Sequence, residues 1–246
     1  MRRLQCALLA TVAAIGFASI ASAADMPVKA RPMPVAAVYN WTGCYIGGHA
    51  GVGWAKRDWS NTANTTAFGD LGPGQGFSQT DSGFVGGGQL GCNYQVNQWV
   101  FGIEGTFAGT SIKGDLANRT FGLALDDVFS SKINSIATVT GRIGLAFNNW
   151  LPYIKGGYAG ANVDFSVSDT VPANVGSGSG TQWHNGWTLG GGVEYGLTPN
   201  WILGLEYDYI SLQSKNYNVA GAAAGVYTFD VTPRISQLLA RISYKF

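Results

Sequence analysis

The sequence has little charge and few of the side chains that usually bind metals. Only 12% of its 246 residues are Asp, Glu, Lys or Arg, and it contains two histidines and three cysteines. The formal net charge is +1 and no basic run is present, so electrostatics give no reason to expect a nucleic-acid partner. Glycine is abundant instead, with 36 residues, and 13% of the chain is aromatic. This composition is too poor in charge for a typical soluble domain, and too polar and glycine-rich for a helical membrane protein.

The chain also lacks a long apolar run, apart from one short stretch near its start. Arg2 and Arg3 precede an apolar segment over residues 8–20, and Ala21-Ser22-Ala23 follows the small-x-small pattern of a cleavage site. The segment is shorter than the ~20 residues that a spanning helix needs. We therefore expect residues 1–23 to be a secretory signal peptide. An exported chain without a spanning helix can be integral to a membrane only as a closed barrel.

The mature chain divides into two regions. Residues 24–40 contain Pro27, Pro32 and Pro34, which favour an extended conformation, and we expect a periplasmic linker there. From Trp41 to Phe246, apolar and polar residues alternate with period two, which is typical of strands. The predicted strands cover residues 43–54, 83–96, 98–111, 134–147, 150–165, 184–196, 200–212 and 234–246. Segments of about ten residues are long enough to cross the apolar layer of a membrane.

The connections between these strands alternate in length. Three are tight, around residues 97, 148–149 and 197–200, and four are long, over 55–82, 112–133, 166–183 and 213–233. Outer-membrane barrels have short periplasmic turns and longer extracellular loops. The sequence therefore predicts an all-β protein, an eight-stranded antiparallel transmembrane barrel over residues 41–246 in the bacterial outer membrane.

Alternation alone does not say which face of the sheet meets lipid, because a soluble β-sandwich or lipocalin-like barrel also alternates. The signal peptide and the polar face both favour the membrane, since glycine, threonine and scattered charges would make a poor soluble core. Aromatic residues also gather beside the short turns, as in the girdle at a membrane interface. These residues are Tyr94, Trp99, Trp150, Tyr195, Trp201, Tyr244 and Phe246.

Six charged residues fall on the polar, inward face of the predicted strands. Three acids and three bases can neutralise one another, and an unpaired charge in a narrow lumen would be costly. These residues are Glu104, Arg142, Lys155, Glu194, Glu206 and Arg241. They could form a gated ion path or a packed polar plug. We favour the plug, because an eight-stranded barrel is only wide enough for its own side chains.

The cysteines and histidines give weaker indications of function than the inward charges do. Cys44 and Cys92 fall near the periplasmic ends of adjacent strands, on the lipid face, and could be bonded or could be two unpaired apolar residues. His49 and His184 are the only histidines, and no ligand cluster surrounds either of them. We therefore expect no metal site, no cofactor and no catalytic residues.

Several motifs, taken together, resemble a known family. The stretch from Tyr39 to Gly48 resembles the small outer-membrane proteins of rhizobia and related alphaproteobacteria, often described as porin-family or outer-membrane immunogenic proteins. The usual residue at position 44 in that family is Phe, so Cys44 departs from the pattern. Further similar stretches are Tyr153-Ile154-Lys155-Gly156-Gly157, Trp187–Tyr195, Trp201 with Glu206-Tyr207, and Arg241–Phe246.

The resemblance implies a barrel distantly like the OmpA membrane domain. It further implies that Tyr244 and Phe246, at the end of this chain, are a signal that the barrel-assembly machinery reads. It also implies a structural role in envelope integrity, contact with outer-membrane lipid and lipopolysaccharide, and surface antigenicity. No catalytic residues carry over, so we expect a non-enzymatic surface barrel. A small-solute pore or a hemin-binding receptor is the alternative. The strand number disfavours a pore, and the two histidines disfavour hemin.

Overall fold

The computed structural model describes residues 39–61, 76–117, 127–169, 178–221 and 225–246. The described residues, from Tyr39 onward, belong to one compact unit. The predicted signal peptide and all of the predicted linker except Tyr39 and Asn40 lie outside the described residues. Among those that are described, no helix is long and apolar enough to span a membrane.

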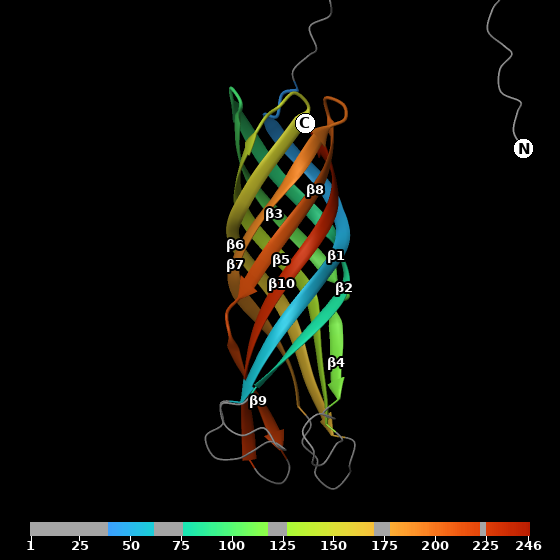
Figure 1. Cartoon of the computed structure of the whole chain (residues 1–246), viewed down its shortest axis with the longest axis vertical. Helices are drawn as coiled ribbons and strands as arrows, with labels where there is room; N and C mark the ends of the chain where they lie inside the picture. Colours follow the sequence, from blue (N-terminus) through green and yellow to red (C-terminus); the bar gives the residue numbers. More distant parts are fainter. Residues whose placement is uncertain (1–38, 62–75, 118–126, 170–177, 222–224) are drawn as a thin grey trace, which may run out of the picture. The chain divides into compact units, whose positions relative to one another are not determined.

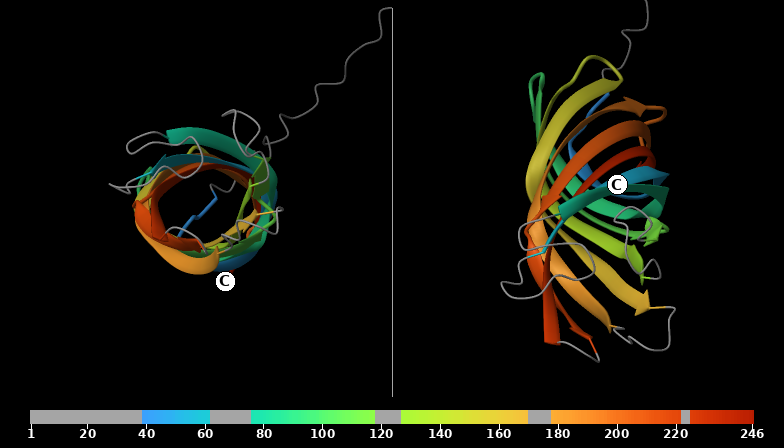
Figure 2. Two further views of the ribbon diagram at one scale, coloured as in Figure 1. Left: turned by 90° about the horizontal axis from the view of Figure 1, so that it is seen from below. Right: turned by 60° about the horizontal axis from the view of Figure 1, so that its bottom comes forward.

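The described chain forms antiparallel strands that pair with their neighbours all the way round a barrel (Figure 1, Figure 2). The strands are β1 (Gly43–Asn61), β2 (Gly76–Val96), β3 (Trp99–Thr110), β4 (Lys113–Ala117), β5 (Asp127–Leu145), β6 (Trp150–Asp169), β7 (Gly178–Gly196), β8 (Trp201–Leu212), β9 (Lys215–Gly221) and β10 (Gly225–Lys245). Eight of them follow the order β1-β2-β3-β5-β6-β7-β8-β10, and β10 pairs with β1 to close the barrel. The predicted eight-stranded barrel is confirmed.

The two remaining strands continue the barrel wall beyond short interruptions. β4 follows β3 after Ser111 and Ile112 and pairs with the same neighbour, β5. β9 follows β8 after Gln213 and Ser214 and pairs with β10. The register of each pairing shifts by one residue across the interruption, as at a β-bulge. Each pair of elements is therefore one interrupted strand of the eight.

The strands extend much further on the extracellular side than the sequence pattern predicts. β1 runs to Asn61 instead of residue 54, and β10 begins at Gly225 instead of residue 234. The prediction of long loops over 55–82, 112–133, 166–183 and 213–233 was wrong for much of each range. Outward residues such as Lys56 and Asp58 are polar there, so the outward face is no longer the more hydrophobic one. The hydrogen-bonded pairing of the strands nevertheless continues.

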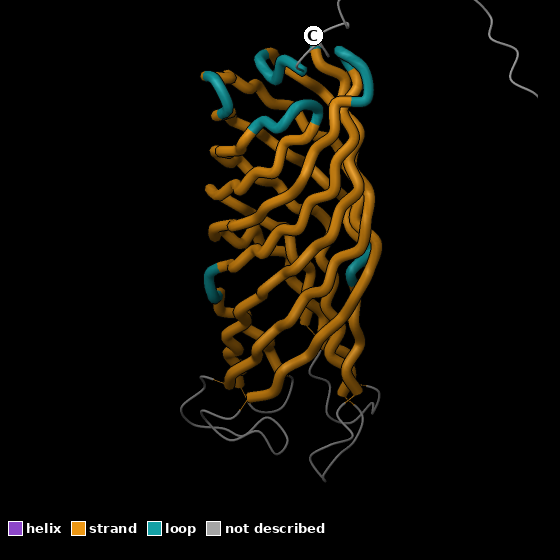
Figure 3. Tube along the Cα trace, turned by 45° about the horizontal axis from the view of Figure 1, so that its top comes forward, coloured by secondary structure: helices purple, strands orange, loops and turns teal. Residues whose placement is uncertain are grey.

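The three short connections lie where the sequence predicts them, at the end of the barrel that carries the C-terminus (Figure 3). Asn97 and Asn148 have φ angles of 55° and 52°. Asparagine tolerates this left-handed conformation better than most residues, which is why it suits tight turns. In the third turn, the Asn200 side chain donates a 2.8 Å hydrogen bond to the carbonyl oxygen of Lys245 and so holds the C-terminus to the turn.

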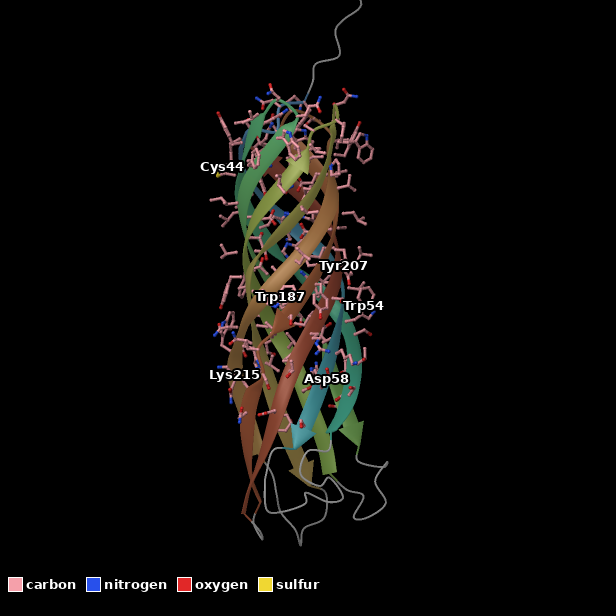
Figure 4. All side chains as sticks on the ribbon, turned by 60° about the vertical axis from the view of Figure 1, so that its left-hand side comes forward. Cys44, Trp54, Asp58, Trp187, Tyr207 and Lys215 are labelled. Atoms are coloured by element: carbon pink, nitrogen blue, oxygen red, sulfur yellow. A yellow bond between two sulfur atoms is a disulfide. The ribbon has the colours of Figure 1, made fainter. Side chains whose placement is uncertain are left out.

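The outer surface carries two bands of aromatic residues with apolar side chains between them. The predicted band beside the short turns includes ring pairs at 4.8 Å, between Trp150 and Tyr195, and at 5.3 Å, between Trp201 and Tyr244. A second band, which the sequence analysis missed, crosses the barrel wall further along, where Trp54, Trp187 and Tyr207 lie at a similar level (Figure 4). It comprises Trp54, Phe84, Tyr158, Trp183, Trp187, Tyr207 and Tyr209.

The two aromatic bands set the boundaries of the membrane. Along β1, the outward residues between them run from Cys44 to Trp54, or about 33 Å at ~3.3 Å per residue. With a strand tilt of about 40°, this corresponds to roughly 25 Å of height, the thickness of the apolar layer that outer-membrane barrels cross. Strand residues beyond Trp54, including Asp58, project outside the lipid on the extracellular side (Figure 4).

Candidate functional site

The structure brings the six inward charges of the sequence analysis into one cluster inside the barrel. Arg142 on β5 and Glu194 on β7 form a two-pronged ion pair, with Nη1–Oε1 and Nη2–Oε2 distances of 3.0 and 2.7 Å. Such pairing has the geometry that guanidinium and carboxylate groups favour. Arg142 is also 3.5 Å from Glu104, which connects this pair to the rest of the cluster.

The centre of the cluster consists of Glu104, Glu206, Lys155 and Arg241. The Lys155 ammonium lies 2.7 Å from Glu206 and 3.4 Å from Glu104, and Arg241 donates to both carboxylates. All four side chains are almost completely shielded from solvent. Because charges in such an interior are costly unless paired, this mutual neutralisation is what makes the cluster tolerable.

Two tyrosines and an aspartate complete the cluster. Tyr45 donates a 2.6 Å hydrogen bond to Glu104, and Tyr153 donates a 2.5 Å hydrogen bond to Glu206. Asp208 lies 3.4 Å from Lys155 and accepts a hydrogen bond from Gln237 at 2.9 Å. Asp208 follows Glu206 by two residues on the same face of its strand. The period-two pattern therefore could have added it to the predicted set.

Apolar side chains fill the lumen on both sides of the charges. Along β6, inward positions run from Leu151 through Tyr153 and Lys155 to Ala159, Ala161 and Val163. The larger layer, on the extracellular side, comprises Ala55, Val85, Ala108, Ile112, Ile133, Ile136, Ala159, Ala161, Val163, Ile210, Leu212, Ile235 and Leu239. The smaller layer, on the periplasmic side, comprises Tyr39, Trp41, Val100, Ala146, Leu151 and Ile202. The sequence analysis described the inward face as polar and missed both layers.

The residues just before β1 fold into the periplasmic mouth of the barrel. Trp41 is fully buried, and its backbone nitrogen donates a 2.8 Å hydrogen bond to the Gln95 side chain. The Tyr39 hydroxyl donates to the carbonyl oxygen of Pro199 at 3.3 Å, and the Lys245 ammonium lies 4.4 Å from the Tyr39 ring. Burial, with a further contribution from the charge of Glu194, raises the pKa of Tyr39 to about 12. Tyr39, predicted as linker, is thus part of the closure, whereas Asn40 is exposed and its carbonyl oxygen accepts a hydrogen bond from Lys245.

The structure also places the cysteines and histidines. Cys44 and Cys92 are directly opposite each other on β1 and β2 and form a disulfide on the lipid face. His49 points into the lumen, where its Nδ1 lies 2.7 Å from Gln89 Oε1. His184 is also buried, with Nδ1 3.0 Å from the carbonyl oxygen of Gln213. Within the described residues, no group of three or more His, Cys, Asp or Glu side chains could hold a metal ion.

These features define the class of protein. A closed antiparallel barrel with an apolar band between two aromatic girdles, and with its charges turned inward, is an outer-membrane β-barrel. The profile of the family described as "Outer membrane protein beta-barrel domain" matches residues 10–246. The chain belongs to this family and is an outer-membrane protein.

Individual relatives agree with this assignment. The chain is 35% identical over 221 residues to a 31 kDa outer-membrane immunogenic protein of Brucella melitensis biotype 1, an alignment that covers 85% of this chain and 88% of that protein. It is 33% identical over 196 residues to a 22 kDa outer membrane protein of Rhizobium leguminosarum bv. viciae, covering 77% and 73%. Among solved structures, OprG of Pseudomonas aeruginosa is similar with a TM-score of 0.49 and 14% identity, covering 85% of this chain and 98% of that one. The family profile and the two sequence relatives confirm the predicted family resemblance.

Proposed function

We propose that the protein is a closed, non-catalytic barrel that supports the integrity of the outer membrane and presents its extracellular strand ends at the cell surface. The observation that carries this proposal is the order of the layers along the lumen. A layer of apolar side chains lies on each side of the neutralised charge cluster. A polar path for ions or solutes would have to break both apolar layers and the ion pairs between them.

The two alternatives fit the geometry less well. A small-solute pore needs a continuous aqueous path, which the buried side chains of Trp41, Leu151 and Ile210 obstruct. A hemin receptor would need an accessible axial ligand. His49 and His184 are only 7% and 0% exposed, and both point into the barrel.

We further propose that the partners are those of a lipid-embedded structural protein. Tyr244 and Phe246 lie at the periplasmic end of β10, with ring centroids 5.6 Å apart, and both side chains are exposed. This is an accessible position for a signal that the barrel-assembly machinery reads. The apolar band contacts membrane lipid, and the projecting strand ends lie at the level of the lipopolysaccharide saccharides.

Single-channel recording of the purified, refolded protein in planar bilayers tests the closed lumen. We expect no stable open level, and resistance of the folded band to heat in gel electrophoresis serves to confirm that the protein has inserted correctly. A reproducible open level of porin size from correctly folded protein would refute the proposal. A strain lacking the gene should show increased envelope permeability, and restoration by a copy carrying Arg142→Met and Glu194→Leu would show that the charges themselves are not the function.

A further inference from the structure

A groove of about 690 Å³ lies at the extracellular end of the barrel, across β4, β5, β6 and β7. The alternation of the strands places its polar side chains on the outer face, because the intervening Ile133, Val163 and Phe165 are buried inside. Thr181 precedes Trp183 of the outer aromatic girdle by two residues, so the groove begins where the lipid ends. This is the level of the headgroups and saccharides of the outer leaflet.

The groove is built from two rows of outward residues that the strand pairing fixes. The first row reads Lys113, Lys132, Asp164 and Thr181, and the second reads Asp115, Ser130, Ser166 and Ser179. In each row, every residue is the direct register partner of the next. The sheet therefore presents two ammonium groups, two carboxylates and four hydroxyl groups to one volume.

The charges in the first row are not matched to each other. Lys113 and Lys132 are directly opposite each other, an arrangement that costs stability because like charges repel across a strand pair. The adjacent Asp164 compensates only one of the two positive charges: it is the register partner of Lys132 and interacts with its charge, while its oxygens accept hydrogen bonds from Thr181 at 2.6 Å and from Asn134 at 2.5 Å. No described carboxylate lies within 4 Å of either lysine ammonium. The other outward charges close to the girdle differ, since Asp58 forms ion pairs with Lys56 and Arg234.

We infer that this groove binds a phosphorylated saccharide, with one phosphate held between Lys113 and Lys132. An anion placed between the two ammonium groups would turn their repulsion into attraction, and lysine is a common phosphate ligand. The serine and threonine hydroxyls, together with Asp115, supply the donors and acceptors that sugar hydroxyls need. The inference rests on the proposed position of the strand ends at the level of the outer-leaflet saccharides, but not on a closed lumen, because the groove lies on the outside of the barrel wall.

The test is a titration of the full-length mature barrel in detergent micelles with a soluble bisphosphorylated glucosamine disaccharide. The unphosphorylated disaccharide serves as the matched ligand. We expect saturable binding of the phosphorylated form, and a Kd that is higher by roughly tenfold or more in the Lys113→Gln/Lys132→Gln variant. The control variant Lys56→Gln/Arg234→Gln makes the same change in net charge on β1 and β10, away from the groove around the barrel wall, and should bind as the wild type does.

A second arm distinguishes the source of the ligand. The barrel is reconstituted in vesicles with and without a lipid that carries the same bisphosphorylated disaccharide, and protection of residues 113 and 132 from amine labelling is measured. Protection only by the lipid-borne form assigns the ligand to the membrane, and equal affinity for the soluble form assigns a free saccharide. If neither form binds, if both disaccharides bind equally, or if the control variant loses as much affinity as the groove variant, the inference is wrong. Because both variants lie outside the membrane band, thermal unfolding can verify that each is folded.

Discussion

Arg142 and Glu194 face each other across the lumen, two strands apart, and their ion pair passes over the intervening β6. The side chains are only 1% and 4% exposed. Each therefore offsets much of the cost of burying the charge of the other.

Removing one partner of this pair should be far more damaging than removing both. Arg142→Ala leaves Glu194 buried without its cation, and we expect the free energy of unfolding to fall by about 3–5 kcal/mol. The Arg142→Met/Glu194→Leu double variant should lose much less, because apolar residues of similar size replace the pair. Urea unfolding in lipid vesicles measures both. Arg234→Ala, which removes an exposed ion pair, should cost less than about 1 kcal/mol, and an equal loss in all three variants would contradict the account.

The disulfide between Cys44 and Cys92 should be present in the mature protein and should stabilise it. The bond joins residues 48 apart in sequence, so it restricts the unfolded chain considerably. We expect Cys44→Ser/Cys92→Ser to fold to the same barrel with an unfolding free energy lower by about 2–4 kcal/mol. Thiol titration of the folded wild type should find no free thiol in the mature chain. Two free thiols would show that the cysteines are unpaired.

The periplasmic closure should depend on Trp41. Its side chain is fully buried among apolar neighbours, and truncation of such a residue typically costs about 3–5 kcal/mol. Trp41→Ala should therefore destabilise the barrel to that extent. Trp201 lies at the same end but is exposed towards lipid, so Trp201→Ala is the matched control. Tryptophan emission supplies a second measurement: acrylamide added from the periplasmic side should quench Trp41 poorly, and efficient quenching would mean that the mouth is open.

Alkaline pH should loosen the same closure through Tyr39. An ordinary tyrosine has a pKa near 10, whereas burial raises that of Tyr39 to about 12 in the folded protein. Between these values the unfolded state loses the Tyr39 proton more readily than the folded state does, so stability falls as the pH rises. Unfolding experiments from pH 9 to 12 should show a steeper loss for the wild type than for Tyr39→Phe. If the free energy of unfolding fell equally with pH in both proteins, Tyr39 would not be the cause of the alkaline destabilisation.

The sequence predicted the barrel and its charge cluster because both depend on period-two alternation. Glu104 and Arg142 both fall on the polar face, and the pairing of β3 with β5 brings them together. The apolar layers were missed because the inward Ile133 and Val163 lie beside the outward Lys132 and Asp164, so the inward face is apolar and the outward face polar there, the reverse of the membrane-spanning part. The lengths of the strands were missed because, outside the lipid, alternation of hydrophobicity no longer marks a strand, although Lys56 and Asp58 still lie in an unbroken hydrogen-bonded ladder.

The projecting wall has a consequence for antibodies raised against this protein. Residues such as Asp58 and Arg234 come from opposite ends of the chain, yet their charged groups lie 3.0 Å apart on the strand surface above the bilayer. An antibody that recognises both would bind the folded barrel and fail on the denatured chain. Antibodies raised against the unfolded chain or against linear peptides would therefore not recognise this part of the surface.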